Sequence, residues 1–372
     1  MRVLVFSLAY LPFVGGAELA VKEITERLPH IDFDLVTANL DGKQPQQERI
    51  GAVTVYRLGR GPLAKYTYPR AAKKFASRLH QQHAYDAVWA IMANQAGLAA
   101  SGFKKKFPTV RYVLTLQEGD SLGAIWLRTW FMRSRYKAIY RRADHIQAIS
   151  KYLLKRAVQY GYTGARSIIP NGVAIDHFAR QRTPAELHEL RTKLGIASDV
   201  PVVVSASRLV HKNALDIVIK AMAKIETAHL VLLGTGSLEE RLRKLSRDLH
   251  IERRVHFVGH VDHRLLPAYL QLSAVFVRPS RSEGLGSAFL EAMAAGVPVV
   301  ATPVGGIVDF LHDGQNGLFC KVDSADDVAE KVNFILTHPT QAAAMSVAAR
   351  TMVHQHYDWR DIANRMASCF IV

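Results

Sequence analysis

Two carboxylates flank a glycine-rich turn in the C-terminal half of the chain. The stretch RSEGLGSAFLEAMAAGVP begins at residue 281, with Glu283 ahead of the glycines and Glu291 inside the helix predicted to follow. The first amides of that helix form its positive end, where phosphate binds readily, and they belong to Gly284, Leu285 and Gly286. A carboxylate accepts hydrogen bonds from sugar or ribose hydroxyls. The segment therefore predicts a sugar-diphosphate site, and the alternative is a capped amphipathic helix with solvated glutamates.

Two cations follow the first strand expected in this half of the chain. Val202–Ser205 leads into Arg208 and Lys212, and open parallel sheets bind their ligands at the carboxyl ends of the strands. At that place the two side chains could stabilise the negative charge that grows on a departing diphosphate. A solvated basic loop is the other interpretation.

Further turns at strand ends could border the same ligand. Gly15 and Gly16 lie between the first predicted strand and the helix after it, where backbone amides could receive a phosphate. Gly234 occupies an equivalent turn, and the strand Val255–Gly259 leads toward Val261. A tight turn that only joins strand to helix is the alternative for each glycine.

The elements that would position these residues follow a regular pattern. Strands rich in β-branched residues alternate with helical stretches, which predicts an α/β fold with parallel sheets and helices on both faces. In the first half, the predicted strands are Val3–Ser7, Phe33–Ala38, Val53–Leu58, Ala87–Ile91, Thr109–Leu116 and His145–Ala148. In the second half, they are Val202–Ser205, His229–Leu233, Val255–Gly259, Val275–Arg278, Val299–Ala301 and Gly317–Cys320.

The chain is long enough for two hydrophobic cores. Its 372 residues and 49% hydrophobic content suit two domains of similar size. Because Pro-Asn-Gly at 170–172 interrupts the pattern, we place a linker near Val173–Thr183. The predicted units are Rossmann-like domains over 1–176 and 177–354, followed by a helix over 355–372 that is expected to pack back on the N-terminal domain.

The charge of the protein favours an anionic partner. The net charge is +16 and the pI is near 9.9, which attracts phosphorylated substrates, anionic lipid or nucleic acid. The segment 125–142 mixes large aromatic residues with clustered cations, as in helices that lie in an anionic membrane interface. A helix with its aromatic residues in the core and its arginines in water is the alternative.

The remaining composition excludes several classes of protein. No run of about 18 apolar residues predicts a membrane-spanning helix. Cys320 and Cys369 are far apart and fit neither a disulfide framework nor a zinc site, which favours a cytoplasmic protein. The histidine pairs lack cysteines or carboxylates at ligand spacing, so we expect no metal site.

Taken together, the motifs resemble those of the retaining glycosyltransferase family four, also called glycosyl transferases group 1, which has the GT-B fold. The resemblance rests on Gly15-Gly16 after Tyr10-x-Pro12, on Asn171-Gly172-Val173, on Arg208 with Lys212, and on Glu283 with Glu291 in Glu-x7-Glu spacing. These motifs occur in the family's order over nearly the whole chain. The resemblance implies two Rossmann-like domains that face a central cleft, with an acceptor domain first and a nucleotide-sugar donor domain second.

The phosphate-binding roles follow from the resemblance. Arg208 and Lys212 would hold the phosphates of the donor and support the leaving diphosphate, assisted by the amides around Gly16, Leu285 and Gly286. Family members typically retain the anomeric configuration and need no bound metal, because basic side chains and helix ends replace the cation. We therefore expect no cofactor other than the nucleotide diphosphate sugar itself.

The resemblance also implies which residues bind the ribose, the sugar and the base of the donor. Glu291 would bind the ribose hydroxyls, and Glu283 would contact the donor sugar near the reacting carbon. The backbone near Val261 would border the base. Gly15, Gly234 and Gly284 complete the predicted donor-binding set.

One segment departs from the family pattern. The family often places a histidine after the strand that here ends at Leu116, and this chain has Gln117, Glu118 and Asp120. Gln117 could donate a hydrogen bond to a sugar hydroxyl, and either carboxylate could orient the acceptor or accept its proton. A plain loop with two carboxylates is the alternative.

The sequence thus predicts a retaining glycosyltransferase that moves a sugar from a nucleotide diphosphate sugar to a hydroxyl acceptor, either lipid-linked or a polysaccharide precursor. Its expected place is the cytoplasm, peripheral on the inner face of the membrane if 125–142 binds lipid, and nucleic acid is not an expected partner. Two alternatives stay open: a non-enzymatic protein that binds polyanions or membrane on the same scaffold, and a GT-B sugar-nucleotide epimerase.

Overall fold

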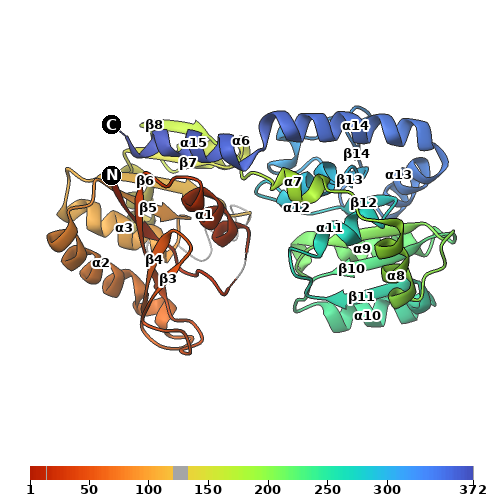
Figure 1. Ribbon diagram of the computed structural model, residues 1–372, viewed down its shortest axis with the longest axis horizontal. Coiled ribbons are helices and arrows are strands. Elements are labelled where there is room, and N and C mark those ends of the chain that lie inside the picture. Colours follow the sequence, from red (N-terminus) through yellow and green to blue (C-terminus); the bar gives the residue numbers. More distant parts are fainter. Residues whose placement is uncertain (14, 120–132, 372) are drawn as a thin grey trace. The chain divides into compact units, whose positions relative to one another are not determined.

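The structure is a computed structural model that describes residues 1–13, 15–119 and 133–371. These residues form two compact units (Figure 1). Within this part of the chain, no helix is long and apolar enough to cross a membrane. Each unit combines a mainly parallel sheet with helices, as the alternating pattern predicts.

The chain divides between the units at two places. The first unit comprises Met1–Gly172 and Trp359–Val372, and the second comprises Val173–Asp358. The boundaries expected after residues 176 and 354 lie a few residues from these. The last segment of the chain therefore belongs to the same unit as the N-terminus.

In the described residues, the first unit contains one eight-stranded sheet. Its strands are β1 (Arg2–Phe6), β2 (Asp32–Ala38), β3 (Gln47–Ile50), β4 (Val53–Leu58), β5 (Ala87–Ile91), β6 (Arg111–Leu116), β7 (His145–Ala148) and β8 (Ala165–Ile168). Their order is β3-β4-β2-β1-β5-β6-β7-β8, and all neighbours are parallel except β3 and β4. The strands predicted in this half are confirmed, and the edge strands β3 and β8 are additions.

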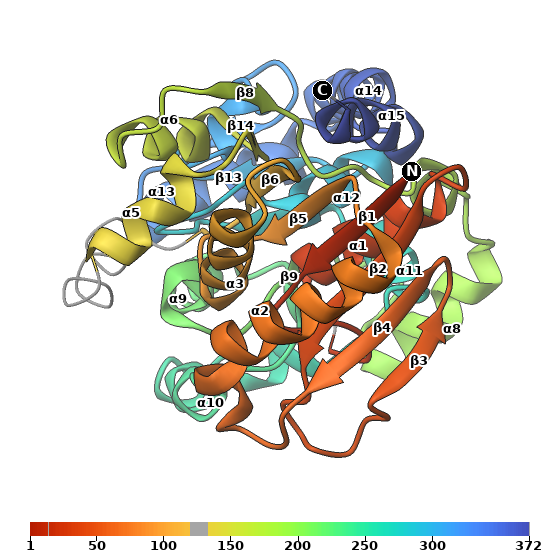
Figure 2. The same ribbon diagram turned by 90° about the vertical axis from the view of Figure 1, so that its left-hand side faces the viewer.

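Helices cover both faces of this sheet. α2, α3 and α5 pack together on one face, and α1 packs with α15 on the other (Figure 2). The helices of the unit are α1 (Gly16–Glu26), α2 (Ala64–His83), α3 (Gln95–Lys106), α5 (Arg133–Arg141), α6 (Lys151–Gln159) and α15 (Trp359–Phe370). The buried side of α15 carries Phe370, whose ring centroid lies 5.4 Å from that of Trp89 in β5. This apolar contact fixes the last helix to the first unit.

The described part of the second unit contains a six-stranded, fully parallel sheet. Its strands are β9 (Val202–Ala206), β10 (His229–Leu233), β11 (Val255–Gly259), β12 (Val275–Arg278), β13 (Val299–Ala301) and β14 (Leu318–Phe319). Their order is β11-β10-β9-β12-β13-β14. All six were predicted, although β14 is shorter than expected.

Helices of the second unit bury an apolar core against this sheet. They are α7 (Ile175–Ala179), α8 (Pro184–Leu194), α9 (Leu215–Met222), α10 (Glu239–Asp248), α11 (Leu266–Gln271), α12 (Ser287–Ala294), α13 (Ala325–Thr337) and α14 (Pro339–His356). Val203 and Leu232 of the sheet pack in one cluster with Val218 of α9 and Val332 of α13. Burial of each such side chain stabilises the fold by roughly 1.5–3 kcal/mol.

The segment predicted as a linker, Val173–Thr183, is ordered within the second unit. The side-chain amide of Gln271, at the end of α11, holds it in place. The amide nitrogen donates to the carbonyl oxygens of Phe178 (3.1 Å) and Arg180 (2.9 Å), and the amide oxygen accepts from the backbone N–H of Arg182 (2.8 Å). The segment is therefore fixed to α11.

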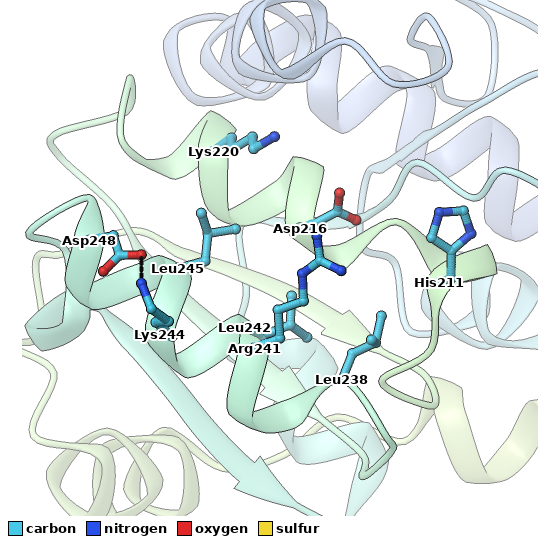
Figure 3. Close-up of a pocket in the computed structure, with 9 residues that line it drawn as sticks. All are labelled: His211, Asp216, Lys220, Leu238, Arg241, Leu242, Lys244, Leu245 and Asp248. Carbon is cyan, nitrogen blue, oxygen red and sulfur yellow. Dashed lines mark hydrogen bonds and ion pairs between the residues drawn. The ribbon is translucent and has the colours of Figure 1, made fainter.

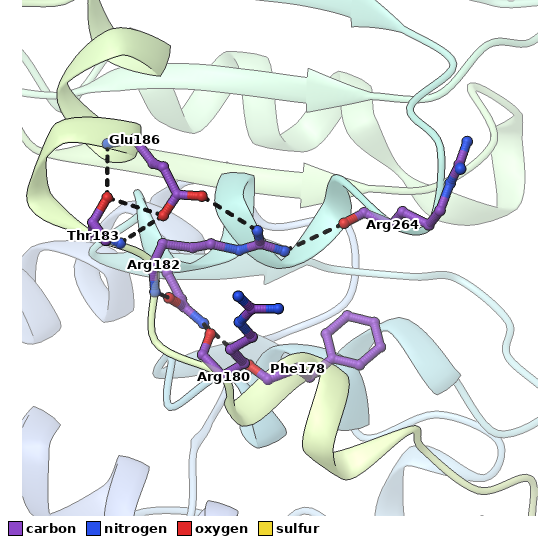
Figure 4. A network of polar contacts seen from close by, with 7 residues as sticks. Phe178, Arg180, Arg182, Thr183, Glu186 and Arg264 are labelled. Carbon is purple, nitrogen blue, oxygen red and sulfur yellow. Dashed lines mark hydrogen bonds and ion pairs between the residues drawn. The ribbon is translucent and has the colours of Figure 1, made fainter.

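A polar network surrounds the start of α8, which follows this segment (Figure 4). Thr183 and Glu186 form a capping box, in which the Thr183 hydroxyl accepts from the Glu186 amide and the Glu186 carboxylate accepts from the Thr183 amide. These hydrogen bonds lower the pKa of Glu186. Arg182 lies 3.6 Å from the Glu186 carboxylate and donates to the carbonyl oxygen of Arg264 at 3.4 Å. The network thereby connects the start of α8 to the loop after β11.

Candidate functional site

Two cationic side chains extend from the loop that follows β9. The loop continues the pairing with the β10 strand, because the amides of Ser207 and Leu209 donate to Leu233 and Thr235 at 2.9 Å. Arg208 is exposed and Lys212 is partly exposed. Neither side chain makes a hydrogen bond or an ion pair with any other residue that the structure describes. The carboxyl end of β9 therefore presents two uncompensated positive charges, where the sequence placed them.

The glycines of the neighbouring turn have a packing role. A Cβ atom at Gly234 would lie 2.1 Å from the carbonyl oxygen of Ser207, and one at Gly236 would lie 2.4 Å from that of Leu209. The amide of Gly234 donates to the carbonyl oxygen of Gly259 at 2.7 Å, so this N–H is not free for a phosphate. The turn instead supports the loop that carries Arg208. Val261, in the loop after β11, is partly exposed.

Glu283 is held by a buried arginine that the sequence analysis did not identify as a site residue. Arg278, the last residue of β12, donates from Nη2 to Glu283 Oε2 at 2.8 Å, and its side chain is only 6% exposed. Its Nη1 donates to the carbonyl oxygen of Ala206, and the guanidinium lies 4.4 Å from the centroid of the Phe289 ring. Burial lowers the pKa of Arg278, which the nearby carboxylates of Glu283 and Glu291 partly offset.

In the turn after Glu283, the backbone conformation and the close packing of Gly286 require glycine. Gly286 has φ +96°, and a Cβ atom there would lie 2.6 Å from the Phe289 ring. The amide of Gly284 donates to Glu283 Oε1 at 3.0 Å. The amides of Leu285 and Gly286, by contrast, have no acceptor in the described chain, and α12 has no side-chain cap. The N-terminal end of α12 is therefore open to an anion.

Arg281 connects the Lys212 loop to the Glu283 turn. Its guanidinium binds the Asp216 carboxylate at 2.9 and 3.0 Å and Asp323 at 2.6 Å, and it also donates to the carbonyl oxygen of His211. Its backbone amide donates to the carbonyl oxygen of Lys212 at 2.7 Å. Because Arg281 bonds both segments, the spacing between the Lys212 backbone and Glu283 is fixed.

Glu291 has a histidine partner. Its Oε1 lies 3.2 Å from Nε2 of His263, and the Glu291 side chain is 13% exposed. The His263 ring stacks on that of His177, with 5.8 Å between the ring centroids. Glu291 thus lies near Arg278 and beside the loop that carries Val261. The sequence does not indicate this contact between His263 and Glu291, which lie 28 residues apart.

In the first unit, Gly15 and Gly16 begin α1 as predicted. Both are exposed, and a Cβ atom at Gly16 would meet no other atom within 4 Å. The buried side chain of Arg57 fixes the preceding loop, since its Nη2 donates to the carbonyl oxygen of Leu11 at 2.6 Å and its Nη1 pairs with Glu48. The start of α1 therefore follows a supported loop, and the carboxylate of Glu18, in the first turn of the helix, lies beside Gly15.

The carboxylate of Glu118, in the loop after β6, is bound by other residues of the first unit. Glu118 Oε2 pairs with Nη2 of Arg156 at 2.7 Å, Oε1 accepts from the amide of Ala93, and the side chains of Arg156 and Glu118 are 1% and 13% exposed. Burial by itself would lower the pKa of the Arg156 guanidinium. The charge of Glu118 and the nearby tyrosines outweigh this effect, so the pKa is raised. Gln117 Oε1 accepts from the Asn171 amide at 3.3 Å. Asp120 lies outside the described residues.

The segment proposed to touch a membrane, 125–142, is described only from residue 133. In that part, α5 buries Tyr136 and Tyr140, whose rings contact that of Tyr160. These two aromatic residues belong to the core, as in the alternative interpretation. The rest of the segment lies outside the described residues. Among those that are described, no cluster of three His, Cys, Asp or Glu side chains could hold a metal ion.

Comparison with known proteins assigns the family. The family "Glycosyltransferase Family 4" matches residues 14–177, and "Glycosyl transferases group 1" matches residues 188–352. A GDP-mannose-dependent alpha-(1-6)-phosphatidylinositol monomannoside mannosyltransferase of Mycolicibacterium smegmatis is 31% identical over 84% of this chain and 83% of its own length. The protein of the same name in Mycobacterium tuberculosis is 33% identical over 78% of this chain and 77% of its own. The chain belongs to glycosyltransferase family 4.

Solved structures show the fold of this glycosyltransferase. Sucrose-phosphate synthase from Thermosynechococcus elongatus superposes with a TM-score of 0.86 at 23% identity, over 99% of this chain and 98% of the other. Anabaena HepE in complex with UDP and glucose gives 0.81 at 21% identity, over the same shares of the two chains. The predicted GT-B fold is confirmed.

The predicted activity class of this glycosyltransferase is also confirmed. The family is that of the resemblance, and the mycobacterial relatives are named as enzymes that use a nucleotide sugar. The chain is therefore a nucleotide-sugar-dependent glycosyltransferase. The alternatives of a non-enzymatic polyanion-binding protein and of an epimerase are not supported.

Proposed function

We propose that this enzyme transfers a mannosyl group from GDP-mannose to a hydroxyl group of a lipid-linked acceptor, with retention of the anomeric configuration and without a metal ion. The observation that carries the proposal is the pair of unpaired cations, Arg208 and Lys212, on a loop that Arg281 bonds to the Glu283 turn. Uncompensated charge at the carboxyl end of a parallel strand suits a diphosphate.

The cations stabilise the leaving group. As the bond between the anomeric carbon and the diphosphate breaks, negative charge grows on the phosphate oxygens. Arg208 and Lys212 neutralise this charge with charge-assisted hydrogen bonds, and the free amides of Leu285 and Gly286 add the positive end of α12. These groups supply what a metal ion supplies in other transferases.

The carboxylates orient the rest of the donor. Glu291, partly accessible beside His263, accepts from the ribose hydroxyls, and Val261 borders the base. Glu283 contacts the sugar near the reacting carbon, and its contact with Arg278 fixes its position. Such positioning holds the reacting groups in one geometry and removes part of the entropic barrier.

The loop after β6 contributes through Gln117 rather than through Glu118. With Oε1 of Gln117 occupied by Asn171, its side-chain N–H groups can donate to a sugar hydroxyl. Glu118 is engaged by Arg156 and by a backbone amide, so we assign it to holding this loop. Asp120 stays a candidate for orienting the acceptor.

The donor proposal is tested with nucleotides in a thermal-shift assay. GDP and GDP-mannose are expected to raise the melting temperature more than UDP and UDP-glucose, because the proposed donor carries guanine. A ligand at a hundredfold excess over its Kd stabilises the native state by about 2.7 kcal/mol. The Arg208→Ala/Lys212→Ala variant should lose the shift with every nucleotide. A larger shift with uridine nucleotides would reject the guanine donor, and no shift with any nucleotide would reject the site.

The acceptor proposal rests on the relatives and on one exposed surface. The mycobacterial relatives are named for a phosphatidylinositol monomannoside acceptor. On α2, the cations Arg70, Lys73 and Arg78 are exposed, and Tyr66, at its start, is 68% exposed. Cations beside an exposed aromatic ring suit a surface of anionic lipid, which would place the enzyme peripherally on the inner membrane face.

Liposome sedimentation tests this surface. The protein is expected to sediment with vesicles that contain phosphatidylinositol at low salt, and much less with vesicles of phosphatidylcholine alone, since each basic residue near the surface contributes about 1 kcal/mol. Lys73→Glu/Arg78→Glu should reduce sedimentation, and Arg247→Glu/Arg253→Glu, on exposed residues of the second unit, should have a smaller effect. Equal sedimentation with both vesicle types would remove membrane binding from the proposal.

A further inference from the structure

The imidazole of His263, in the loop after β11, is held against α7. It stacks on the ring of His177, with 5.8 Å between the ring centroids, and it lies nearly perpendicular to the ring of Phe178 at 5.2 Å. Phe178 is fully buried. The backbone is fixed as well, because Nε2 of His177 donates to the carbonyl oxygen of His263 at 3.1 Å. The position of the imidazole is therefore set by contacts within the second unit.

This imidazole makes a hydrogen bond to Glu291 of α12. Nε2 of His263 lies 3.2 Å from Oε1 of Glu291, and because an ionised carboxylate can only accept, Nε2 donates. The other carboxylate oxygen, Oε2, has no hydrogen-bond partner among the residues that the structure describes, and the side chain is 13% exposed. Glu291 is thus held through one oxygen and can accept from a ligand with the other.

The hydrogen bond orders a side chain that would otherwise be free to rotate. A glutamate loses side-chain freedom when it binds a ligand, and a protein contact that fixes it beforehand removes part of this cost. The nearby guanidinium of Arg278 does not provide this contact, because it donates to Glu283 and to the carbonyl oxygen of Ala206. In the described part of the chain, His263 is the residue that hydrogen-bonds the Glu291 carboxylate.

The hollow between α9 and α10 is a separate feature of the second unit (Figure 3). It has a volume of about 370 Å³, and neither His263 nor Glu291 lines it. Its carboxylates, Asp216 and Asp248, are each paired with an arginine or a lysine, which competes with a sugar hydroxyl for their oxygens. A variant of this hollow therefore serves as a control for nucleotide binding at Glu291.

We propose that His263 is a positioning residue for the ribose of the donor. It holds the Glu291 carboxylate in the orientation that accepts hydrogen bonds from the ribose hydroxyls. The preference of the enzyme for ribonucleotides over nucleotides that lack these hydroxyls then depends on both residues. The inference rests on the proposed function, which assigns Glu291 to the ribose, and it adds the residue on which that contact depends.

Isothermal titration of the full-length enzyme with GDP and with 2′,3′-dideoxy-GDP tests the proposal. The unchanged enzyme is expected to bind GDP at least about tenfold more tightly, because hydrogen bonds to a charged group are lost with the hydroxyls. His263→Phe keeps a ring against α7 and removes the N–H donor. It should weaken GDP binding by about three- to tenfold and leave binding of the dideoxynucleotide unchanged. UDP and its dideoxy form repeat the comparison, because the ribose is common to both nucleotides.

Further variants separate hydrogen bonding from packing. His263→Gln loses the ring, keeps a side-chain N–H donor, and should restore most of the preference for the ribonucleotide. His354→Phe makes the matched exchange on an exposed residue of α14. Arg241→Ala changes the wall of the hollow between α9 and α10. Both of these control variants should leave the two dissociation constants unchanged.

Glu291→Leu distinguishes this inference from the proposed function. The variant removes the carboxylate and is expected to lose the preference for the ribonucleotide. If it does so while His263→Phe keeps the full preference, His263 has no role at the ribose, and the proposed donor site stands. Equal weakening of both nucleotides by His263→Phe would show a general structural effect and would also overturn the inference. If neither ribonucleotide binds the unchanged enzyme, or if Glu291→Leu keeps the preference, the assignment of Glu291 is wrong and the inference fails with it.

Discussion

Replacement of Lys212 by methionine is expected to lower kcat by about 10²–10³-fold at saturating donor. Methionine keeps much of the side-chain length and removes the charge, so the departing diphosphate loses a partner as its negative charge grows. Release of nucleoside diphosphate, with donor concentration varied, measures the effect. If kcat and kcat/KM fall together, Lys212 acts mainly in the transition state rather than in donor binding.

Two further variants make this result specific. Arg208→Met is expected to give a loss of similar size, because Arg208 is the other unpaired cation of the loop. Lys321→Met changes an exposed lysine elsewhere in the second unit and should leave kcat unchanged. Turnover of Lys212→Met at the rate of the unchanged enzyme would contradict the assignment of the cations to the leaving group.

Replacement of Arg156 by methionine is expected to destabilise the first unit by about 3–5 kcal/mol. The change leaves the Glu118 carboxylate in a largely buried position without its counter-charge. The sequence of the second unit, Val173–Asp358, contains no tryptophan, and Trp89 and Trp359 belong to the first unit, so tryptophan fluorescence in a denaturant titration reports the unfolding of the first unit. A lower midpoint with an unchanged slope is the expected result.

The companion variants separate loss of charge pairing from loss of volume. Arg156→Met/Glu118→Met removes both charges and should recover most of the lost stability, since two apolar side chains often replace a buried pair without penalty. Arg166→Met, on an exposed residue of β8, should change the midpoint little. If Arg156→Met behaved like Arg166→Met, the pair would not hold the loop, and Glu118 would return to the list of catalytic candidates.

Much of the fold could be predicted because its central strands are apolar runs. β5 and β10, for example, have the bounds that their apolar residues predict, since burial on both faces of a parallel sheet demands such runs. β3 and β8 could not be found in this way. They read QERI and ARSI and lie at the sheet edges, where partly exposed side chains remove the apolar signal.

The site could be predicted where its residues belong to local motifs. Arg208, Lys212 and the Glu283 turn each follow a strand within a few residues. Their position at the carboxyl ends of the strands is therefore a consequence of the local sequence. The partners of the carboxylates could not be predicted from such motifs. Arg156 lies 38 residues from Glu118, and His263 lies 28 residues from Glu291, so only the folded chain brings each pair together.

One signal in the sequence could have revealed Arg278. It ends the otherwise apolar strand Val-Phe-Val-Arg, and an arginine in such a run is expected to be buried with a partner. Helix α6 holds a similar signal, because Arg156 shares the buried side of the helix with Leu153 and Ala157. In both cases a cation on an apolar face indicates a nearby carboxylate.

The contribution of α15 to the first unit has a consequence for synthesis on the ribosome. Trp359 packs over Gly172, Arg111 donates to the carbonyl oxygen of Cys369 at 2.7 Å, and Arg365 donates to that of Ile168 at 2.6 Å. These contacts can form only after the whole second unit has been translated. The unit whose chain emerges first is therefore completed last, and a nascent chain released before residue 359 leaves an apolar surface uncovered that chaperones would recognise.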